Sequence, residues 1–141
     1  LLASIRDSYR SSIPLSKTEQ KIINEIKTIT QIIYRLKRAR TKSQIFFILS
    51  QKLDQTIGIL YDIGSNGIKR KISIYNRIKE TKPFITGKDL VKFHLPAGRS
   101  YHYILKRLYA AQLDKRIRGR KEAIIWFERL KWKSSLISRQ S

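Results

Sequence analysis

The side chains best suited to chemistry in this sequence are cations that lie close together near its C-terminal end. Residues 114–121 contain five Lys and Arg residues and a single acid, Asp114. An Arg side chain can place two N–H groups on one phosphate, so such a cluster predicts contact with a polyanion. The alternative is a solvated basic loop, and the scarcity of acidic neighbours favours phosphate contact. The candidate residues are Lys115, Arg116, Arg118, Arg120 and Lys121.

Two further groups of cations lie earlier in the chain. The first predicts a basic helix face that contacts RNA, and it consists of Lys69, Arg70 and Lys71, followed by Arg77 and Lys79. The second lies at 35–40, at the end of a predicted helix, where cations also stabilise the helix dipole. For the second group, RNA contact and dipole stabilisation remain open alternatives.

Gly87 and Lys88 open a short predicted helix. Free amides at a helix start can take a phosphate, and Lys88 would add a positive charge. The alternative is that Thr86 and Asp89 cap the helix and do nothing more. Both functions can be served by the same residues.

Three consecutive rings, Tyr101, His102 and Tyr103, follow Arg99. Aromatic side chains among cations suit stacking on unpaired bases. Adjacent positions on a helix point in different directions, so some of these rings must pack in the core. We expect Tyr103 to be a core residue, and both interpretations stay open for Tyr101 and His102. Trp126 and Phe127 are also expected in the core.

Residues suited to catalysis or metal binding are few. The chain has no Cys, and its two His residues, His94 and His102, are not accompanied by clustered carboxylates. No Ser-His-Asp grouping or pair of carboxylates is suggested by the spacing. We therefore expect no metal site, no cofactor and no enzymatic activity in this chain.

The overall charge sets the expected class of partner. The sequence has 141 residues, with 31 Lys and Arg against 10 Asp and Glu, a net charge of +21. Residues 1–63 contribute +6 and residues 64–141 contribute +15. A compact fold with this much like charge is most easily tolerated beside a polyanion, and nucleic acid is the commonest one. A membrane surface or an acidic protein is a weaker alternative. No apolar run is long enough to span a bilayer.

The elements that must position these residues are predicted to be helices. Apolar residues recur at three- and four-residue steps, no alternating strand pattern persists, and Ser16 to Glu19 form a capping box. The sequence predicts an all-α fold, an irregular bundle of about seven helices. Their expected ranges are 16–39, 43–53, 54–63, 68–81, 86–93, 99–113 and 120–131, with a turn at 64–67. We expect a helical body at 1–82, a basic helical region at 83–133 and a flexible tail at 134–141.

One stretch has a distinctive order of residues. Ile85-Thr86-Gly87-Lys88-Asp89-Leu90 is followed by Leu95-Pro96 and Gly98, by Ile104-Leu105, by Ala111-Gln112-Leu113-Asp114 and by Glu122-Ala123. This pattern, over about 47 residues, resembles the C-terminal tail of the tRNA nucleotidyltransferases (CCA-adding enzymes) and the related bacterial poly(A) polymerases. The resemblance implies a helical module that holds the elbow of tRNA and supplies no chemistry. Catalysis in that family belongs to a separate head with an Asp-x-Asp motif, which this sequence lacks.

Three positions depart from the family pattern. Arg99 stands where Pro is usual, His102 where Gly is common, and Lys115 where Gly usually follows Ala-Gln-Leu-Asp. These changes add charge or bulk at the junctions between loops and helices. They fit a related module pressed against a different RNA surface.

The sequence thus favours a non-catalytic RNA-binding protein, a basic scaffold on structured RNA and a structural subunit of a ribosome or other ribonucleoprotein. The expected partners are rRNA or tRNA and other proteins of the particle, with no membrane. The alternative is a tRNA-binding C-terminal fragment of a CCA-adding enzyme whose head lies elsewhere. Since the chain opens at Leu1, we expect a processed form or a piece of a longer protein. The abundance of Ile and Lys fits an AT-rich coding sequence, which favours an organelle (mitochondrion or plastid) over the cytoplasm.

Overall fold

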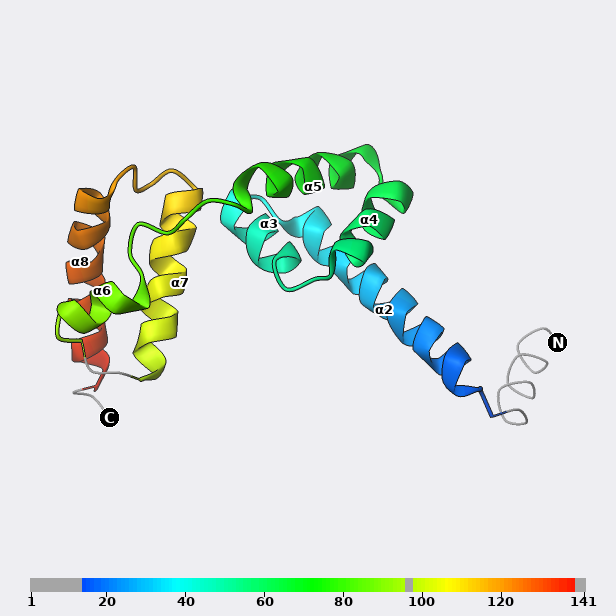
Figure 1. The fold of residues 1–141 in the computed structure, drawn as a ribbon, viewed down its shortest axis with the longest axis horizontal. Coiled ribbons are helices and arrows are strands. Elements are labelled where there is room, and N and C mark those ends of the chain that lie inside the picture. Colours follow the sequence, from blue (N-terminus) through cyan, green and yellow to red (C-terminus); the bar gives the residue numbers. More distant parts are fainter. Residues whose placement is uncertain (1–13, 96–97, 139–141) are drawn as a thin grey trace.

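The computed structural model describes residues 14–95 and 98–138, without the side chains of Arg99 and residues 132–138. Within these residues the fold consists of seven α-helices and no strand, which confirms the predicted all-α class (Figure 1). The helices are α2 (Lys17–Arg38), α3 (Lys42–Leu49), α4 (Asp54–Ile63), α5 (Asn66–Ile78), α6 (Gly87–Lys92), α7 (Arg99–Leu113) and α8 (Arg120–Ser138).

The helices form two lobes, each around its own apolar core (Figure 1). The N-terminal lobe comprises α2–α5, and its fully buried side chains include Leu36, Leu49, Leu60, Ile68 and Ile72. The C-terminal lobe comprises α6–α8, and its fully buried side chains include Leu90, Ile104, Ile117 and Phe127. The segment between α5 and α6, residues 79–86, connects the two lobes, so the basic stretches of α5 and of 114–121 belong to different lobes.

Helix α2 begins where its capping box predicts. The Glu19 amide donates to the Ser16 hydroxyl oxygen at 3.2 Å, and the Ser16 amide donates to the Glu19 carboxylate at 2.8 Å. Only the C-terminal half of α2 is covered by the lobe, where Ile32 and Leu36 are buried. The N-terminal half projects away from the lobes, and Ile22 and Ile26 are 50% and 57% exposed (Figure 1).

Four helix boundaries differ from the prediction by two residues or more, among them the end of α5, which lies at Ile78 and not at 81. Helix α3 ends at Leu49, because Leu53 has extended backbone angles (φ −68°, ψ 147°) as the N-cap of α4. Helix α5 begins at Asn66, so the predicted four-residue turn at 64–67 is shortened to Gly64 and the N-cap Ser65. Helix α8 continues to Ser138, through part of the stretch expected as a flexible tail, and residues 139–141 lie outside the described part of the chain.

The lobes meet mainly where α3 packs against α7. The Phe46 ring of α3 meets the Tyr109 ring of α7 edge-on, with 5.2 Å between ring centroids. The connecting segment is fixed to the same helix, since the Gln112 side chain donates to the Lys82 carbonyl at 2.8 Å and accepts from the Phe84 amide at 2.9 Å. Residues of the Ala111-Gln112-Leu113-Asp114 stretch therefore hold the two lobes together.

Candidate nucleic-acid interface

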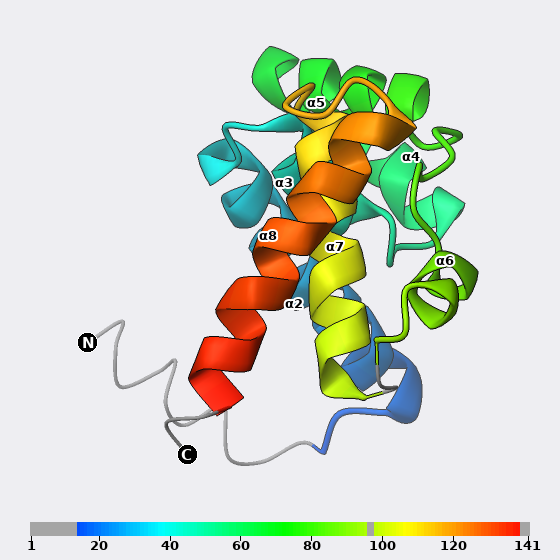
Figure 2. The same ribbon diagram turned by 90° about the vertical axis from the view of Figure 1, so that its left-hand side faces the viewer.

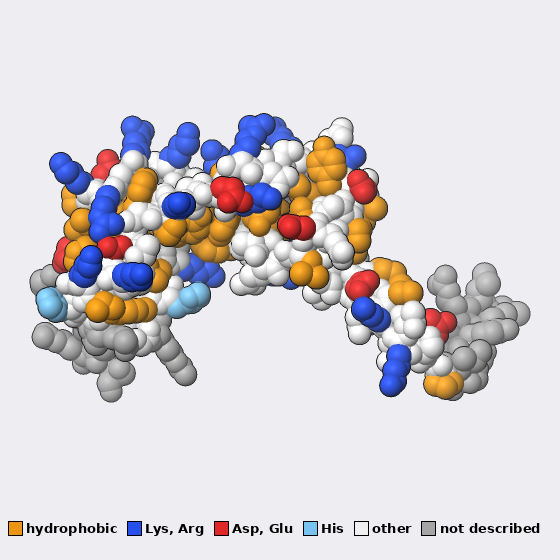
Figure 3. Space-filling model, in the orientation of Figure 1, with side chains coloured by type: hydrophobic (Ala, Val, Ile, Leu, Met, Phe, Trp, Pro, Cys, Tyr) orange, Lys and Arg blue, Asp and Glu red, His pale blue; other side chains and the backbone are white. Residues whose placement is uncertain are grey.

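Exposed cations line one edge of the molecule. In Figure 3, Lys and Arg side chains gather along the upper edge, over α5 and over the connection from α7 to α8, and the ribbon views show both elements on that edge (Figures 1 and 2). We call six exposed cations the basic edge, two on α5, three in the connection and one in the first turn of α8: Arg70, Arg77, Lys115, Arg116, Arg118 and Lys121. The edge thus combines two groups of cations that lie about 45 residues apart in the sequence and that an extended polyanion could contact together.

The connection between α7 and α8 is held firmly by its own backbone. The Arg116 amide donates to the Ala111 carbonyl at 2.8 Å and the Lys115 amide to the Gln112 carbonyl at 3.0 Å, which together form a Schellman motif. Ile117 is 2% exposed and anchors the loop in the C-terminal core. The Arg118 amide donates to the Glu122 carboxylate at 2.8 Å. This geometry presents Lys115, Arg116 and Arg118 outward from a fixed backbone.

The Schellman motif sets the backbone conformation of Lys115. It needs a residue in the left-handed region after the helix end, and Lys115 occupies it with φ of 59°. Glycine adopts that conformation without steric cost, whereas Lys does not. A lysine at this position therefore costs stability that a glycine would not.

Arg120 has a structural partner. Its Nη2 lies 2.6 Å from Oδ1 of Asp89, and its Nη1 donates to the Phe84 carbonyl at 2.8 Å. Asp89 is buried and also accepts from the amide and hydroxyl of Thr86, both at 2.8 Å, which completes the capping box of α6. The Arg120 and Thr86 hydrogen bonds hold the pKa of Asp89 well below its usual range. Arg120 thus joins α8 to α6, although its side chain remains 54% exposed.

Lys71 is also used by the fold. Its Nζ donates to the carbonyl oxygens of Leu36 at 2.5 Å and Lys37 at 3.1 Å, at the C-terminal end of α2. The last carbonyls of a helix are open to partners from outside it, and a cation there also complements the helix dipole. Lys71 therefore fastens α5 to α2, while its neighbour Arg70 is exposed.

The structure describes the side chains of two of the three remaining candidates, Lys69 and Lys88. Lys69 is half-buried, with its Nζ 5.5 Å from the centroid of the Tyr61 ring. Lys88 is exposed in the first turn of α6. The Arg99 side chain lies outside the described residues. RNA contact by these three residues stays a prediction.

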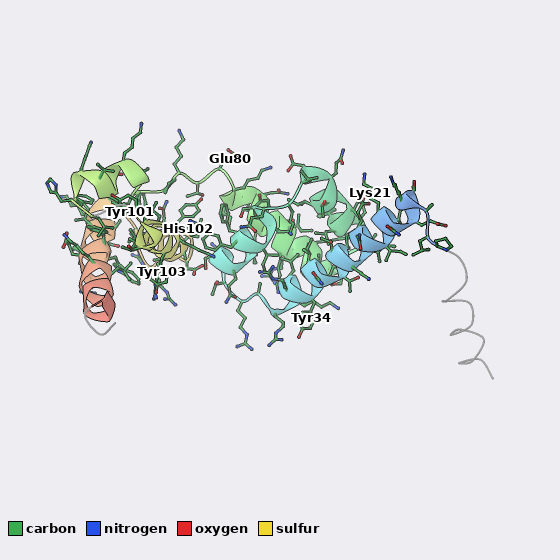
Figure 4. All side chains as sticks on the ribbon, turned by 90° about the horizontal axis from the view of Figure 1, so that it is seen from below. Lys21, Tyr34, Glu80, Tyr101, His102 and Tyr103 are labelled. Atoms are coloured by element: carbon green, nitrogen blue, oxygen red, sulfur yellow. The ribbon has the colours of Figure 1, made fainter. Side chains whose placement is uncertain are left out.

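The three consecutive rings of α7 lie in different surroundings (Figure 4). Tyr101 is half-buried against the C-terminal core, and its hydroxyl donates to the Leu95 carbonyl at 2.6 Å, so it supports the fold. The expectation that Tyr103 is a core residue is wrong, because Tyr103 is 53% exposed. His102 is exposed and lines a groove between the lobes. The phase of the helix explains this outcome, since consecutive residues lie about 100° apart around its axis. Phe127, in contrast, is fully buried and Trp126 packs on the same core, as expected.

The prediction overlooked several residues that combine rings with cations. Arg38 lies over the Tyr34 ring and Arg107 over the Tyr103 ring, at 5.5 Å and 5.4 Å from the ring centroids. Both pairs are separated by four positions on a helix, a spacing that brings side chains together and is readable in the sequence. Lys106 lies over Phe47 at 5.0 Å, between two helices, and has no such local signal.

No three His, Cys, Asp or Glu side chains in the described part of the chain come together in a way that could hold a metal ion. No helix among the described residues combines the length and the apolar character that crossing a membrane requires.

Comparison with known proteins returned no match to a protein family, to a curated protein or to a solved structure. The assignment of function below therefore rests on the residues and the geometry of this chain.

Proposed function

We propose that this chain is a non-catalytic RNA-binding protein that acts as a basic helical scaffold on structured RNA, as a subunit of a ribosome or other ribonucleoprotein, in an organelle. The observation that carries the proposal is the excess of cations. If each of the 10 acids were paired with a separate cation, 21 of the 31 Lys and Arg side chains would still have no acidic partner. A polyanion with closely spaced phosphates is the partner that such an excess suits best.

The arrangement of the basic edge supports contact with the RNA backbone. Its cations project from a helix and from a loop whose backbone is fixed. Phosphate contacts of this kind set the position and orientation of a protein on RNA and carry little sequence information. The proposed recognition is therefore of RNA shape and phosphate spacing.

The salt dependence of binding tests the basic edge. Replacing Lys115, Arg116 and Arg118 with Ala should weaken binding to a structured RNA and reduce the slope of log K against log salt by about two to three, at roughly 0.7–0.9 per phosphate contact. The matched control replaces Lys17, Lys21 and Lys27, which are exposed on the projecting half of α2, and removes the same charge. An equal loss of slope in both variants would mean that net charge alone drives binding and that the edge is not an interface.

A second candidate is the tRNA-binding fragment of a CCA-adding enzyme. It is favoured by the contacts of the residues that carry the resemblance. Thr86 and Asp89 bond to each other within the C-terminal lobe. Gln112 and Asp114 join that lobe to the connecting segment and to the N-terminal lobe. In that case the module would hold the tRNA elbow, and nucleotide addition would belong to a head elsewhere.

Sedimentation of the native protein, before and after RNase treatment, separates the two candidates. If the protein travels with a ribosomal subunit and RNase releases it, the scaffold proposal stands. If it sediments as a small particle with tRNA, or joined to a nucleotidyltransferase head, the second candidate is correct.

A further inference from the structure

Two adjoining grooves lie along the junction between the lobes. The first has a volume of about 440 Å³ and lies between the C-terminal end of α2, α3 and α7. The second has a volume of about 460 Å³ and lies between α3, the segment that leads into α6, and α7. Phe47 and Lys106 line both grooves, so the two adjoin each other, and we call them together the interlobe groove.

The first part of the interlobe groove combines cations with exposed rings. Arg35, Arg38 and Lys106 supply three positive charges, and no acid is present among the residues that line it. Tyr34 is 60% exposed, and Arg38 Nη1 donates to its hydroxyl at 2.6 Å. This hydrogen bond holds the guanidinium beside the Tyr34 ring, which fixes a positive charge and an aromatic surface next to each other.

The second part of the groove is less charged and more aromatic. Phe47 and Tyr109 line it from α3 and α7, and His102 is an exposed ring on its wall. Figure 4 shows His102 on the side of α7 that faces α3, and Tyr34 at the opposite end of the junction, on α2. Lys106 is the one cation among the lining residues of this part, and no acid lines it. A flat, uncharged group would fit here beside a phosphate bound at Lys106.

We propose that the interlobe groove binds an unpaired segment of RNA, with phosphates at Arg35, Arg38 and Lys106 and bases against Tyr34, Phe47 and His102. This inference rests on the proposed RNA-binding function and adds the class of RNA that this site takes. Single-stranded nucleic acids are bound by grooves that alternate cations for the backbone with aromatic rings for the bases. Each part of the groove has a volume typical of sites for small ligands, enough for about one nucleotide.

An acidic peptide explains the groove less well. Carboxylates would use the three cations, but they would leave the exposed faces of Tyr34 and His102 without a partner. Bases use both features, because every base has a face that can stack on a ring or on an Arg guanidinium. The pairing of rings with cations in one wall therefore favours RNA over an acidic protein segment.

The test compares two nearly identical pairs on the full chain. The Tyr34–Arg38 pair lines the groove, whereas the Tyr103–Arg107 pair lines neither part of it. The two pairs have the same spacing in the sequence, the same hydrogen bond from Arg Nη1 to the Tyr hydroxyl, and almost the same distance from the Arg side chain to the ring centroid. Fluorescence anisotropy would measure binding of a labelled oligouridylate of about eight nucleotides. Tyr34→Leu should weaken binding by about 5- to 150-fold, the effect of losing one stacked base, and Tyr103→Leu should leave it unchanged.

A melting measurement and a second variant test whether weaker binding is caused by misfolding. Tyr34 is exposed, so Tyr34→Leu should melt at the wild-type temperature by circular dichroism. Lys106→Gln should also weaken oligouridylate binding and reduce its salt slope by about 0.7. If Tyr34→Leu and Lys106→Gln both bind as tightly as the wild type, or if Tyr103→Leu is as weak as Tyr34→Leu, the interlobe groove is not the site.

The outcome for the wild-type chain separates this inference from the proposed function. Binding to a structured RNA hairpin without binding to oligouridylate would overturn the groove and leave the proposed function standing. Binding to neither would overturn both. If an oligoglutamate of equal charge displaces oligouridylate as well as unlabelled oligouridylate does, the groove is a site for acidic peptides and the inference is wrong.

Discussion

The Asp114 carboxylate at the end of α7 accepts two hydrogen bonds from Ser43 at the start of α3, from the amide at 2.9 Å and from the hydroxyl at 2.7 Å. Ser43 is buried, with 6% exposure, and the two residues are 71 positions apart. The carboxylate satisfies an amide in the first turn of α3 and so caps that helix from the other lobe. This contact therefore joins the two lobes where the start of α3 meets the end of α7.

A double-mutant cycle on this pair tests its contribution to stability. Asp114→Ala should lower the free energy of unfolding by about 1–3 kcal/mol, because it leaves buried donors without a partner. Ser43→Ala keeps the amide bond, removes the hydroxyl bond to Asp114 and the 3.0 Å contact with the Thr41 hydroxyl, and should cost about 1 kcal/mol. Urea titration of both single variants and the double variant should give a coupling energy above about 0.5 kcal/mol. Strict additivity would show that the two residues act independently.

Gly64, between α4 and α5, should not accept a side chain. A Cβ there would lie 2.7 Å from Cγ2 of Ile68 and closer still to the Leu60 carbonyl oxygen, which is backbone and cannot move aside. Gly64→Ala should therefore cost about 1–3 kcal/mol through overpacking. Gly58→Ala is the matched control, because its Cβ would meet no atom within 4 Å, and it should stabilise α4 by about 0.5–1 kcal/mol. Equal thermal shifts for the two variants would contradict this reading of the turn.

Local patterns predicted the helices well. Signals within a few residues predicted the ends of α4 and α7 and the capping boxes of α2 and α6. The structure confirms these features. The assignment of Tyr103 to the core failed, because a small change in the phase of a helix exchanges a core position for an exposed one.

Contacts between distant residues could not be predicted. Nothing local to Lys71 or Arg120 shows that one completes the end of α2 and the other pairs with Asp89. The interlobe groove was missed for the same reason, since Phe47 and Lys106 are brought together by the packing of α3 on α7. The Tyr34–Arg38 spacing, in contrast, was visible in the sequence and could have indicated half of that site.

Acid should weaken the junction of α6 and α8 through Asp89. Its pKa is held well below the unfolded value of about 3.9 by Arg120 and Thr86, so protonation favours the unfolded chain. The contribution is complete above about pH 4 and is lost as the pH falls below that value. Asp89→Asn should thus be less stable than the wild type near neutral pH and lose less stability on acidification.

Urea titrations at about pH 7 and about pH 3 measure this difference. Asp62→Asn, at an exposed position of α4, removes the same charge and should keep the wild-type dependence on pH. A residual dependence is expected in every variant, because the hydrogen bonds from Ser16 also lower the pKa of Glu19. If Asp89→Asn and the wild type lose equal stability in acid, the Asp89–Arg120 pair is not the group that responds.

Lys115 should show a conflict between stability and binding. It occupies the left-handed position of the α7 Schellman motif, with φ of 59°. A residue with a Cβ costs about 1–2 kcal/mol in that conformation, so Lys115→Gly should raise the free energy of unfolding by about 1 kcal/mol. The same change removes a cation from the basic edge and should reduce the salt slope of RNA binding by about 0.7–0.9.

His94 offers the control, because it occupies the same position after α6 (φ 54°), where the Leu95 amide donates to the Leu90 carbonyl at 3.2 Å. His94→Gly should give a similar gain in stability, since it relieves the same conformation, but it should leave RNA binding unchanged. A Lys115→Gly variant that is stabilised yet binds RNA with the wild-type slope would remove Lys115 from the interface. Stabilisation accompanied by weaker binding would mean that the lysine keeps a strained backbone because its charge meets a phosphate.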